Sequence, residues 1–107
     1  MVKGDIVFIR FPFTDLTNTK VRPALVLSTY DDDITVSFIT SRLYYQDKYD
    51  IVINPTKRNG LKKTSVIRVN KIVTLDNSLA LGLLGKISAA ELNMVNEVLV
   101  DFLDLAE

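Results

Sequence analysis

The sequence contains no cysteine, no histidine and no tryptophan among its 107 residues. Without cysteine there can be no disulfide, no thiolate metal site and no cysteine nucleophile. Without histidine the chain lacks the most common general base and the most common metal ligand. The four glycines do not have the spacing of a phosphate-binding loop. Any chemistry must therefore use Asp, Glu, Lys, Arg, Tyr, Ser or Thr.

Charge of neither sign is in excess, because 13 basic residues balance 13 acidic ones. The distribution is uneven, however. Residues 51–75 carry six basic side chains and no acidic one, whereas residues 87–107 carry five acidic side chains and no basic one. Such an asymmetry favours an anionic partner for the basic region, although charge runs also occur on ordinary solvated surfaces.

Long hydrophobic runs are also missing, since none approaches the 18 residues of a membrane span. Asp5 and Arg10 interrupt the apolar stretch near the N-terminus, so we do not expect it to be a signal peptide. We expect a cytoplasmic protein. A hydrophobic content of 48% in 107 residues predicts one globular domain over residues 1–107.

Most of the chain has the composition of short β-strands, rich in β-branched and aromatic residues between polar turns. The continuous apolar centre of residues 24–27 predicts a strand that is buried on both faces. The predicted strands are residues 5–11, 21–28, 34–39, 49–53, 65–69, 72–75 and 81–87, with Asn70-Lys71 separating the fifth from the sixth.

The last part of the chain changes period. Ser88 and Glu91 form a capping-box pattern, in which each side chain satisfies an N–H group of the first helical turn. Apolar residues then recur every three or four positions, from Leu92 to Phe102. The fold class is therefore mainly β with α. About six or seven short strands would form a small curved or closed sheet, and a C-terminal amphipathic helix would cover an opening or an edge.

Three positions within the strands suggest anion binding. Arg22 begins an otherwise apolar strand, Arg68 interrupts another, and Thr40-Ser41 ends a third. An arginine fork suits phosphate, and hydroxyl groups can complete a phosphate site. The alternative is that both arginines are outward-facing strand residues and that the hydroxyl pair only terminates its strand.

Several of these segments together resemble one family. They are Gly4-Asp5-Ile6-Val7, Phe11-Pro12-Phe13-Thr14-Asp15, Arg22-Pro23-Ala24-Leu25-Val26-Leu27-Ser28, Ile39-Thr40-Ser41 and Gly60-Leu61-Lys62-Lys63-Thr64-Ser65-Val66. In this order, and followed by a terminal helix, they resemble the MazF/PemK toxins of bacterial toxin–antitoxin systems. The resemblance covers nearly the whole chain.

This resemblance implies a small SH3-like β-barrel that works as a homodimer. It also implies an endoribonuclease toxin that cuts single-stranded RNA, often mRNA, at short sequences and without a metal ion or other cofactor. The 2′-hydroxyl of the RNA would be the nucleophile, leaving a cyclic phosphate and a 5′-hydroxyl. A cognate antitoxin would lay a flexible acidic segment over the RNA groove. A substrate that supplies its own nucleophile fits a chain without cysteine or histidine.

The family's site residues carry over by position. Arg22 and Thr40 match its principal active-site arginine and threonine, with Arg22 stabilising the phosphorane and Thr40 bonding the scissile phosphate. Ser41 and Arg68 would make secondary contacts. The PemK branch has an aspartate two residues beyond Arg68, proposed as the base, but this sequence has Asn70 there. An amide is not a useful proton acceptor, so the sequence leaves the base unassigned.

Further RNA contacts are expected from the polar loop that follows the first strand and from the basic region. The residues expected to bind RNA are Phe13, Thr14, Asp15, Thr17, Asn18, Lys20, Lys57, Lys62, Lys63 and Asn70.

Two other functions fit the same resemblance. A gyrase-poisoning toxin shares the fold but uses a C-terminal tail with tryptophan, which this chain lacks. A catalytically weak interaction module is the other alternative, and Asn70 is the feature in its favour.

Overall fold

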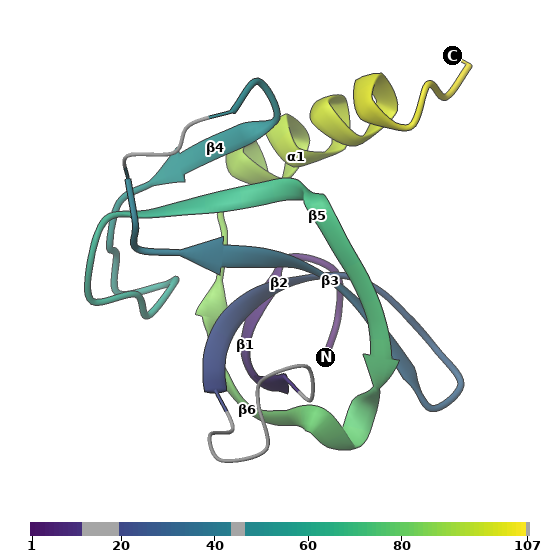
Figure 1. Ribbon diagram of the computed structural model, residues 1–107. Coiled ribbons are helices and arrows are strands. Elements are labelled where there is room, and N and C mark those ends of the chain that lie inside the picture. Colours follow the sequence, from purple (N-terminus) through teal and green to yellow (C-terminus); the bar gives the residue numbers. More distant parts are fainter. Residues whose placement is uncertain (12–19, 44–46, 107) are drawn as a thin grey trace.

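The computed structural model describes residues 1–11, 20–43 and 47–106. These residues form a β-sheet, a short 3₁₀ helix and a C-terminal α-helix (Figure 1). In chain order the elements are β1 (Asp5–Phe11), β2 (Lys20–Tyr30), β3 (Asp33–Thr40), β4 (Asp50–Ile53), β5 (Ser65–Asp76), η1 (Asn77–Leu79), β6 (Ala80–Lys86) and α1 (Ala89–Phe102). Within this described part, no helix has the length and apolar character needed to cross a membrane.

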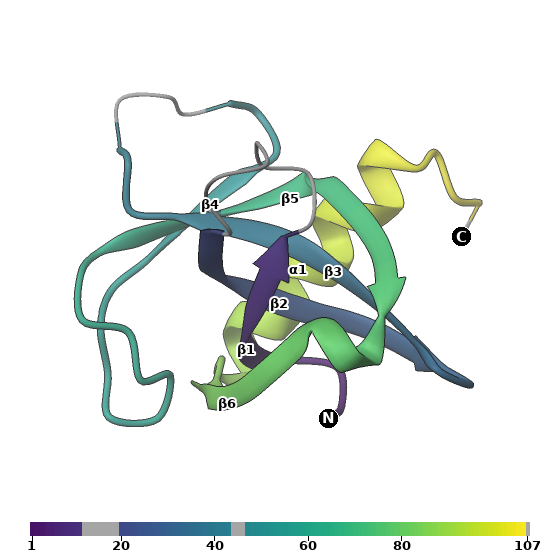
Figure 2. The same ribbon diagram turned by 60° about the horizontal axis from the view of Figure 1, so that its bottom comes forward.

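The six strands form one sheet in the order β4-β5-β3-β2-β1-β6, and every neighbouring pair is antiparallel. The sheet curls strongly, so that β6 comes round toward the end of β5 while β4 and β6 remain its edges (Figures 1 and 2). The expectation of a mainly β fold with a C-terminal helix is confirmed. The barrel takes the form of a curved sheet that does not close.

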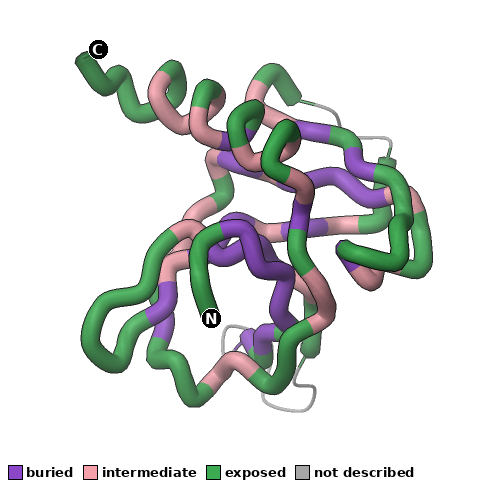
Figure 3. Tube along the Cα trace, turned by 180° about the vertical axis from the view of Figure 1, so that it is seen from behind, coloured by how far each residue is buried: buried purple, intermediate pink, exposed green. Residues whose placement is uncertain are grey.

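Both faces of this sheet are buried along its centre. On β2, Ala24, Leu25 and Val26 have no exposed surface, as the continuous apolar run predicted. Their side chains alternate between two core clusters. One cluster lies on the convex face under α1, and the other fills the concave face (Figure 3 shows the buried segments in purple).

The prediction of two strands over residues 65–69 and 72–75 is wrong, because β5 is continuous. An irregularity in the pairing lies between them: Phe38 is opposite Arg68, but the preceding residue, Ser37, is opposite Ile72. The buried Ser37 hydroxyl donates a hydrogen bond to the Val69 carbonyl at 2.9 Å and stabilises this bulge. Extra residues in a bulge break the alternating pattern, so the sequence suggested a gap where the strand only bends.

The helix begins as predicted. The Glu91 N–H donates to Ser88 Oγ at 3.1 Å, and the Ser88 N–H donates to Glu91 Oε1 at 2.8 Å, so the capping box is complete. Val95 is fully buried against the convex cluster, with Leu92 and Leu99 packed beside it. The helix therefore covers the convex face of the sheet (Figure 1).

Candidate functional site

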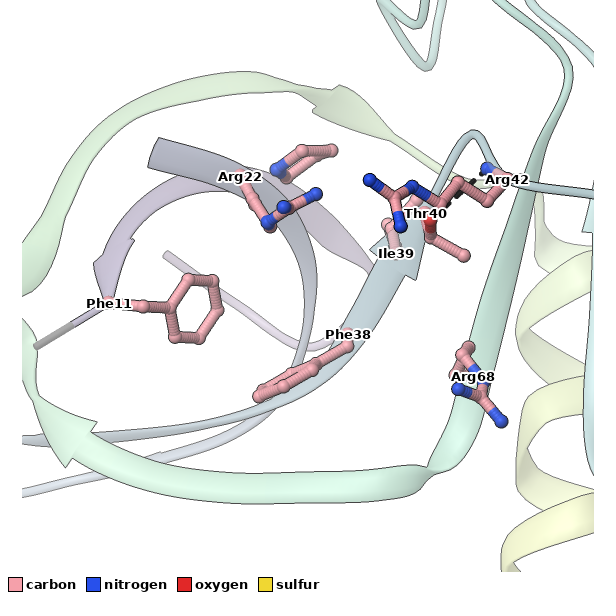
Figure 4. Close-up of a pocket in the computed structure, with 8 residues that line it drawn as sticks. Phe11, Arg22, Phe38, Ile39, Thr40, Arg42 and Arg68 are labelled. Carbon is pink, nitrogen blue, oxygen red and sulfur yellow. Dashed lines mark hydrogen bonds between the residues drawn. The ribbon is translucent and has the colours of Figure 1, made fainter. Parts of the chain in front are cut away.

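A pocket of about 320 Å³ lies near the start of β2 and the end of β3. Its walls come from β1, β2, β3 and β5 and from the residues just after β3 (Figure 4). The lining residues are Phe11, Arg22, Pro23, Phe38, Ile39, Thr40, Arg42 and Arg68. We call it the arginine pocket.

Strand register explains why residues far apart in sequence meet here. Ala24, Phe38 and Arg68 lie opposite one another on β2, β3 and β5, and side chains opposite one another share a face. Arg22 is two residues before Ala24, and Thr40 is two residues after Phe38. Because side chains alternate with period two, both return to this same concave face. The sequence-predicted pair of Arg22 and Thr40 is thus brought into one pocket.

Arg22 and Arg42 give the pocket its positive charge. Both are exposed, and neither forms an ion pair with any residue that the structure describes. Their guanidinium groups extend toward each other across the pocket (Figure 4). The backbone N–H of Arg42 donates to Thr40 Oγ1 at 3.1 Å, and this hydrogen bond fixes the chain just after β3. Two cations with no ion-pair partner in the described part of the chain make this wall of the pocket a favourable place for an anion.

The sequence reasoning did not single out Arg42. A signal was available, because Arg42 follows Thr40 by two residues, and alternation along an extended chain would return it to the same face. The pattern that predicts a phosphate site ends at the hydroxyl pair Thr40-Ser41 and does not include this arginine.

Arg68 occupies a different environment at the other side of the pocket. Its Nε is 3.6 Å from Oδ1 of Asp50, the residue opposite it on β4, and the side chain turns toward β4 and away from the other arginines (Figure 4). The Asp50 side chain is only 1% exposed, whereas that of Arg68 is 28% exposed. Asp50 Oδ2 accepts the N–H of Asp47 at 2.9 Å. The charge of Arg68 is therefore offset within the protein.

Two phenylalanines supply an apolar wall. The rings of Phe11 and Phe38 meet edge to face, with their centroids 4.8 Å apart. Phe11 is 5% exposed and Phe38 is half-buried. The sequence had assigned neither ring to a site. Aromatic side chains beside cations are a common arrangement in sites that bind single-stranded nucleic acid.

A second pocket, of about 240 Å³, lies beyond Pro23, which lines both. It contains three of the residues expected to bind RNA or phosphate, namely Ser41, Lys62 and Lys63. Its remaining lining residues are Phe8, Pro23, Gly60, Leu61, Ser65 and Leu84. We call it the lysine pocket.

The other predicted RNA-binding residues are dispersed. Lys20 is exposed at the start of β2, opposite Phe11, and Lys57 is exposed in the loop after β4. Asn70 is half-buried in the bulge of β5, and its Oδ1 is buried without a hydrogen bond. These three line neither pocket. Another five predicted residues lie outside the described part of the chain: Phe13, Thr14, Asp15, Thr17 and Asn18.

Acidic groups are scarce at the site. No Asp or Glu lines the arginine pocket within residues 1–11, 20–43 and 47–106. Over the same ranges, no three acidic side chains come close enough together to hold a metal ion. The described site therefore offers guanidinium and hydroxyl groups to a ligand.

Comparisons with known proteins identify the family of the chain. Residues 2–103 match the family described as PemK-like, MazF-like toxin of type II toxin–antitoxin system. This match covers most of the chain, and the chain therefore belongs to that toxin family. No significant match was found among curated proteins.

Solved structures share the fold. A MazE–MazF complex from Deinococcus radiodurans has a TM-score of 0.78 at 24% identity, covering 99% of this chain and 98% of the other. The Mycobacterium tuberculosis toxin MazF-mt6 has a TM-score of 0.78 at 19% identity, covering 96% and 99%. An endoribonuclease in complex with its cognate antitoxin, from a mycobacterial species, has a TM-score of 0.76 at 19% identity, covering 100% and 98%.

Proposed function

We propose that this toxin is an endoribonuclease that cuts single-stranded RNA in the arginine pocket. The observation that carries the proposal is the meeting of Arg22, Arg42 and Thr40 in one pocket, with no acidic neighbour among the described residues. Phosphate is the anion that guanidinium forks and a hydroxyl recognise best. Membership of the toxin family and the endoribonuclease among its structural neighbours support RNA as the source of that phosphate.

In the proposed reaction the 2′-oxygen of one nucleotide attacks the adjacent phosphorus. A P–O2′ bond forms and the P–O5′ bond breaks, while the 2′-hydroxyl gives its proton to water and the departing 5′-oxygen takes one from water, which gives a 2′,3′-cyclic phosphate and a 5′-hydroxyl. Arg22, assisted by Arg42, stabilises the added negative charge of the phosphorane, and the Thr40 hydroxyl donates to a phosphate oxygen. Charge stabilisation of this kind is often the largest single catalytic contribution.

The proposed substrate is a short recognition sequence in unpaired mRNA, because only unpaired RNA exposes its base edges and 2′-hydroxyl groups together. Cutting mRNA would stop translation and growth. The family resemblance carries the further proposal that no metal or cofactor takes part, and a substrate that supplies its own nucleophile is compatible with it.

The proposed protein partners are a second copy of the chain and a cognate antitoxin. Two structural neighbours are toxins with an antitoxin bound. An acidic, flexible antitoxin segment would find its counter-charge at Arg22 and Arg42 and would thereby exclude RNA. We place this system in the cytoplasm, where mRNA is available.

The test is the cleavage of a long unstructured RNA by the purified protein in EDTA, followed by analysis of the new ends. We expect cuts at a short recurring sequence, each with a 2′,3′-cyclic phosphate and a 5′-hydroxyl. A 2′-deoxy nucleotide placed on the 5′ side of the cut should abolish cleavage there. Cleavage that needs a divalent metal, or that survives the 2′-deoxy substitution, would contradict the mechanism.

A further inference from the structure

The lysine pocket shares an edge with the arginine pocket. Thr40 lines the first and Ser41, the next residue, lines the second, and the Cα atoms of consecutive residues are only about 3.8 Å apart. Pro23, on the neighbouring strand β2, lines both. The two pockets therefore adjoin at the same strand ends, so one continuous ligand can reach both.

The lysine pocket is lined largely by apolar residues and contains a partly exposed aromatic ring. Phe8 is 37% exposed, and its neighbours across the sheet are Pro23 on β2 and Gly82 on β6. Because Gly82 has no side chain, nothing from β6 covers the ring at that position. A Cβ built at Gly82 would meet no atom within 4 Å. The face of Phe8 is thus open to a flat apolar group.

The wall that carries Lys62 and Lys63 is held rigidly by the turn before it. Asn59 is 1% exposed, and its Oδ1 accepts the N–H groups of Thr56 and Leu61, each at 3.0 Å. The adjacent Gly60 has a φ of +71° and packs so closely on β6 that a Cβ there would collide with the Leu84 carbonyl oxygen. The lysine pocket is therefore formed before a ligand arrives, which lowers the entropic cost of binding.

We propose that the lysine pocket holds the nucleotide next to the scissile phosphate, with its base against Phe8 and its phosphate at Lys62, Lys63 and Ser41. The proposal rests on the proposed ribonuclease function and adds a base-binding subsite to it. An apolar floor with a few polar groups at the rim is typical of a small-ligand pocket. An aromatic face beside cations matches the two parts of a nucleotide, the base and the phosphate.

A second copy of the chain suits this pocket less well. A two-fold interface centred here would place Lys62 and Lys63 near the same lysines of the partner, and like charges repel. A nucleotide brings negative charge to the two lysines instead. The observations therefore favour RNA over self-association as the occupant.

The test uses an RNA oligonucleotide with one cleavage site and a series in which single nucleotides are replaced by abasic ones. In the wild-type protein, one abasic position beside the cut should lower kcat/KM about tenfold, in line with the energy of stacking one base on an aromatic ring. In Phe8→Ala this penalty should disappear at that position alone, because base and ring act as a pair. Leu81→Ala, an exposed apolar residue outside both pockets, is the matched control and should keep every penalty.

Two further variants separate binding from folding. Gly82→Val adds a side chain beside Phe8 in open space, so it should fold normally and reproduce the effect of Phe8→Ala. Lys62→Gln/Lys63→Gln should raise KM and reduce the salt dependence of binding. Lys3→Gln/Lys71→Gln, which removes the same charge elsewhere, should do neither.

Equal abasic penalties in wild type and Phe8→Ala at every position would overturn the proposal while leaving the ribonuclease function intact. A change of oligomeric state in Phe8→Ala with unchanged penalties would overturn it in favour of a protein interface. If the wild type cuts no RNA, the ribonuclease function fails separately. Fluorescence anisotropy of the same oligonucleotide then decides the subsite: binding about tenfold weaker in Phe8→Ala supports it, and unchanged binding overturns it.

Discussion

Arg22 and Arg68 line the same pocket but lie in opposite electrostatic surroundings. Arg22 and Arg42 are both exposed, and neither has an acidic partner among the described residues. Arg68 is partly buried and lies 3.6 Å from the buried Asp50 carboxylate. An arginine without a counter-charge keeps its full attraction for an incoming phosphate, whereas a paired one must share it. On one side of the pocket Arg22 and Arg42 can attract an anion, and on the other side the charge of Arg68 is offset by Asp50.

This difference shows why residue type and strand position did not suffice to rank the two arginines. Arg22 begins one apolar strand and Arg68 interrupts another, and both residues suggest phosphate binding. What separates them is the residue opposite, which for Arg68 is Asp50 on β4. That neighbour is 18 positions away in sequence and is known only once the register is known.

The largest expected effect is the contrast between Arg22→Gln and Arg68→Gln in RNA cleavage. Removing one donor that stabilises transition-state charge commonly costs about 100- to 1,000-fold in kcat, and we expect this loss for Arg22→Gln. Arg68→Gln should lose only about tenfold, since its charge is already offset by Asp50. Single-turnover cleavage measures both. Arg10→Gln, an exposed strand arginine outside the pocket, is the control, and equal losses at positions 22 and 68 would remove the contrast.

The next effect concerns the stability of the side of the pocket where Asp50 offsets the charge of Arg68. Asp50→Asn should lower the free energy of unfolding by about 1–3 kcal/mol, because it leaves a partly buried guanidinium without its carboxylate. Urea denaturation of Asp50→Asn, Arg68→Gln and the double variant measures the coupling between the two residues. Once either residue is changed, changing the other should cost less. Strictly additive losses would show that the pair does not interact.

A smaller effect is expected at Arg42, the cation that the sequence reasoning missed. Arg42→Gln should lower kcat/KM severalfold, because Arg42 assists Arg22 at the phosphate, and it should change unfolding little, because its side chain is exposed. Binding of an uncleavable 2′-deoxy oligonucleotide at several salt concentrations gives a second measure. The slope of log K against log salt should shrink by about 0.7, the value for one phosphate contact on a single strand. An unchanged slope would place Arg42 outside the RNA path.

The smallest expected effect is at the exposed ion pair Lys48–Asp101, which serves as a reference for the buried pair Asp50–Arg68. Lys48 and Asp101 are 3.8 Å apart, with side chains 71% and 62% exposed. Asp101→Asn should change the free energy of unfolding by less than about 0.5 kcal/mol, because water and salt screen such a pair. If Asp101→Asn proved as costly as Asp50→Asn, burial would not be what distinguishes Asp50.

Much of the fold could be predicted from local patterns. The strand over residues 5–11 and the capped helix after Ser88 follow from β-branched composition and from capping chemistry, and both are confirmed. The continuous strand β5 was predicted as two, since the bulge around Asn70 interrupts its alternation. Local pattern cannot distinguish a bulge from a turn, because the partner strand makes the difference.

Less of the candidate site than of the fold could be predicted from the sequence. The sequence placed Arg22 and Thr40 together through the family resemblance, and the structure shows them in one pocket. The division of the predicted residues between two pockets depends on which face each side chain takes, and therefore on register. Asp50 was not considered at all, because its burial and its opposition to Arg68 are properties of the assembled sheet.

The most direct test of the central claim is the single-turnover cleavage of one unstructured RNA in EDTA by the wild type, Arg22→Ala and Arg10→Ala. The account predicts site-specific cuts by the wild type and by Arg10→Ala, and a loss of about 100-fold or more in Arg22→Ala with unchanged thermal unfolding. Equal cleavage by Arg22→Ala and the wild type would contradict the placement of the reaction in the arginine pocket.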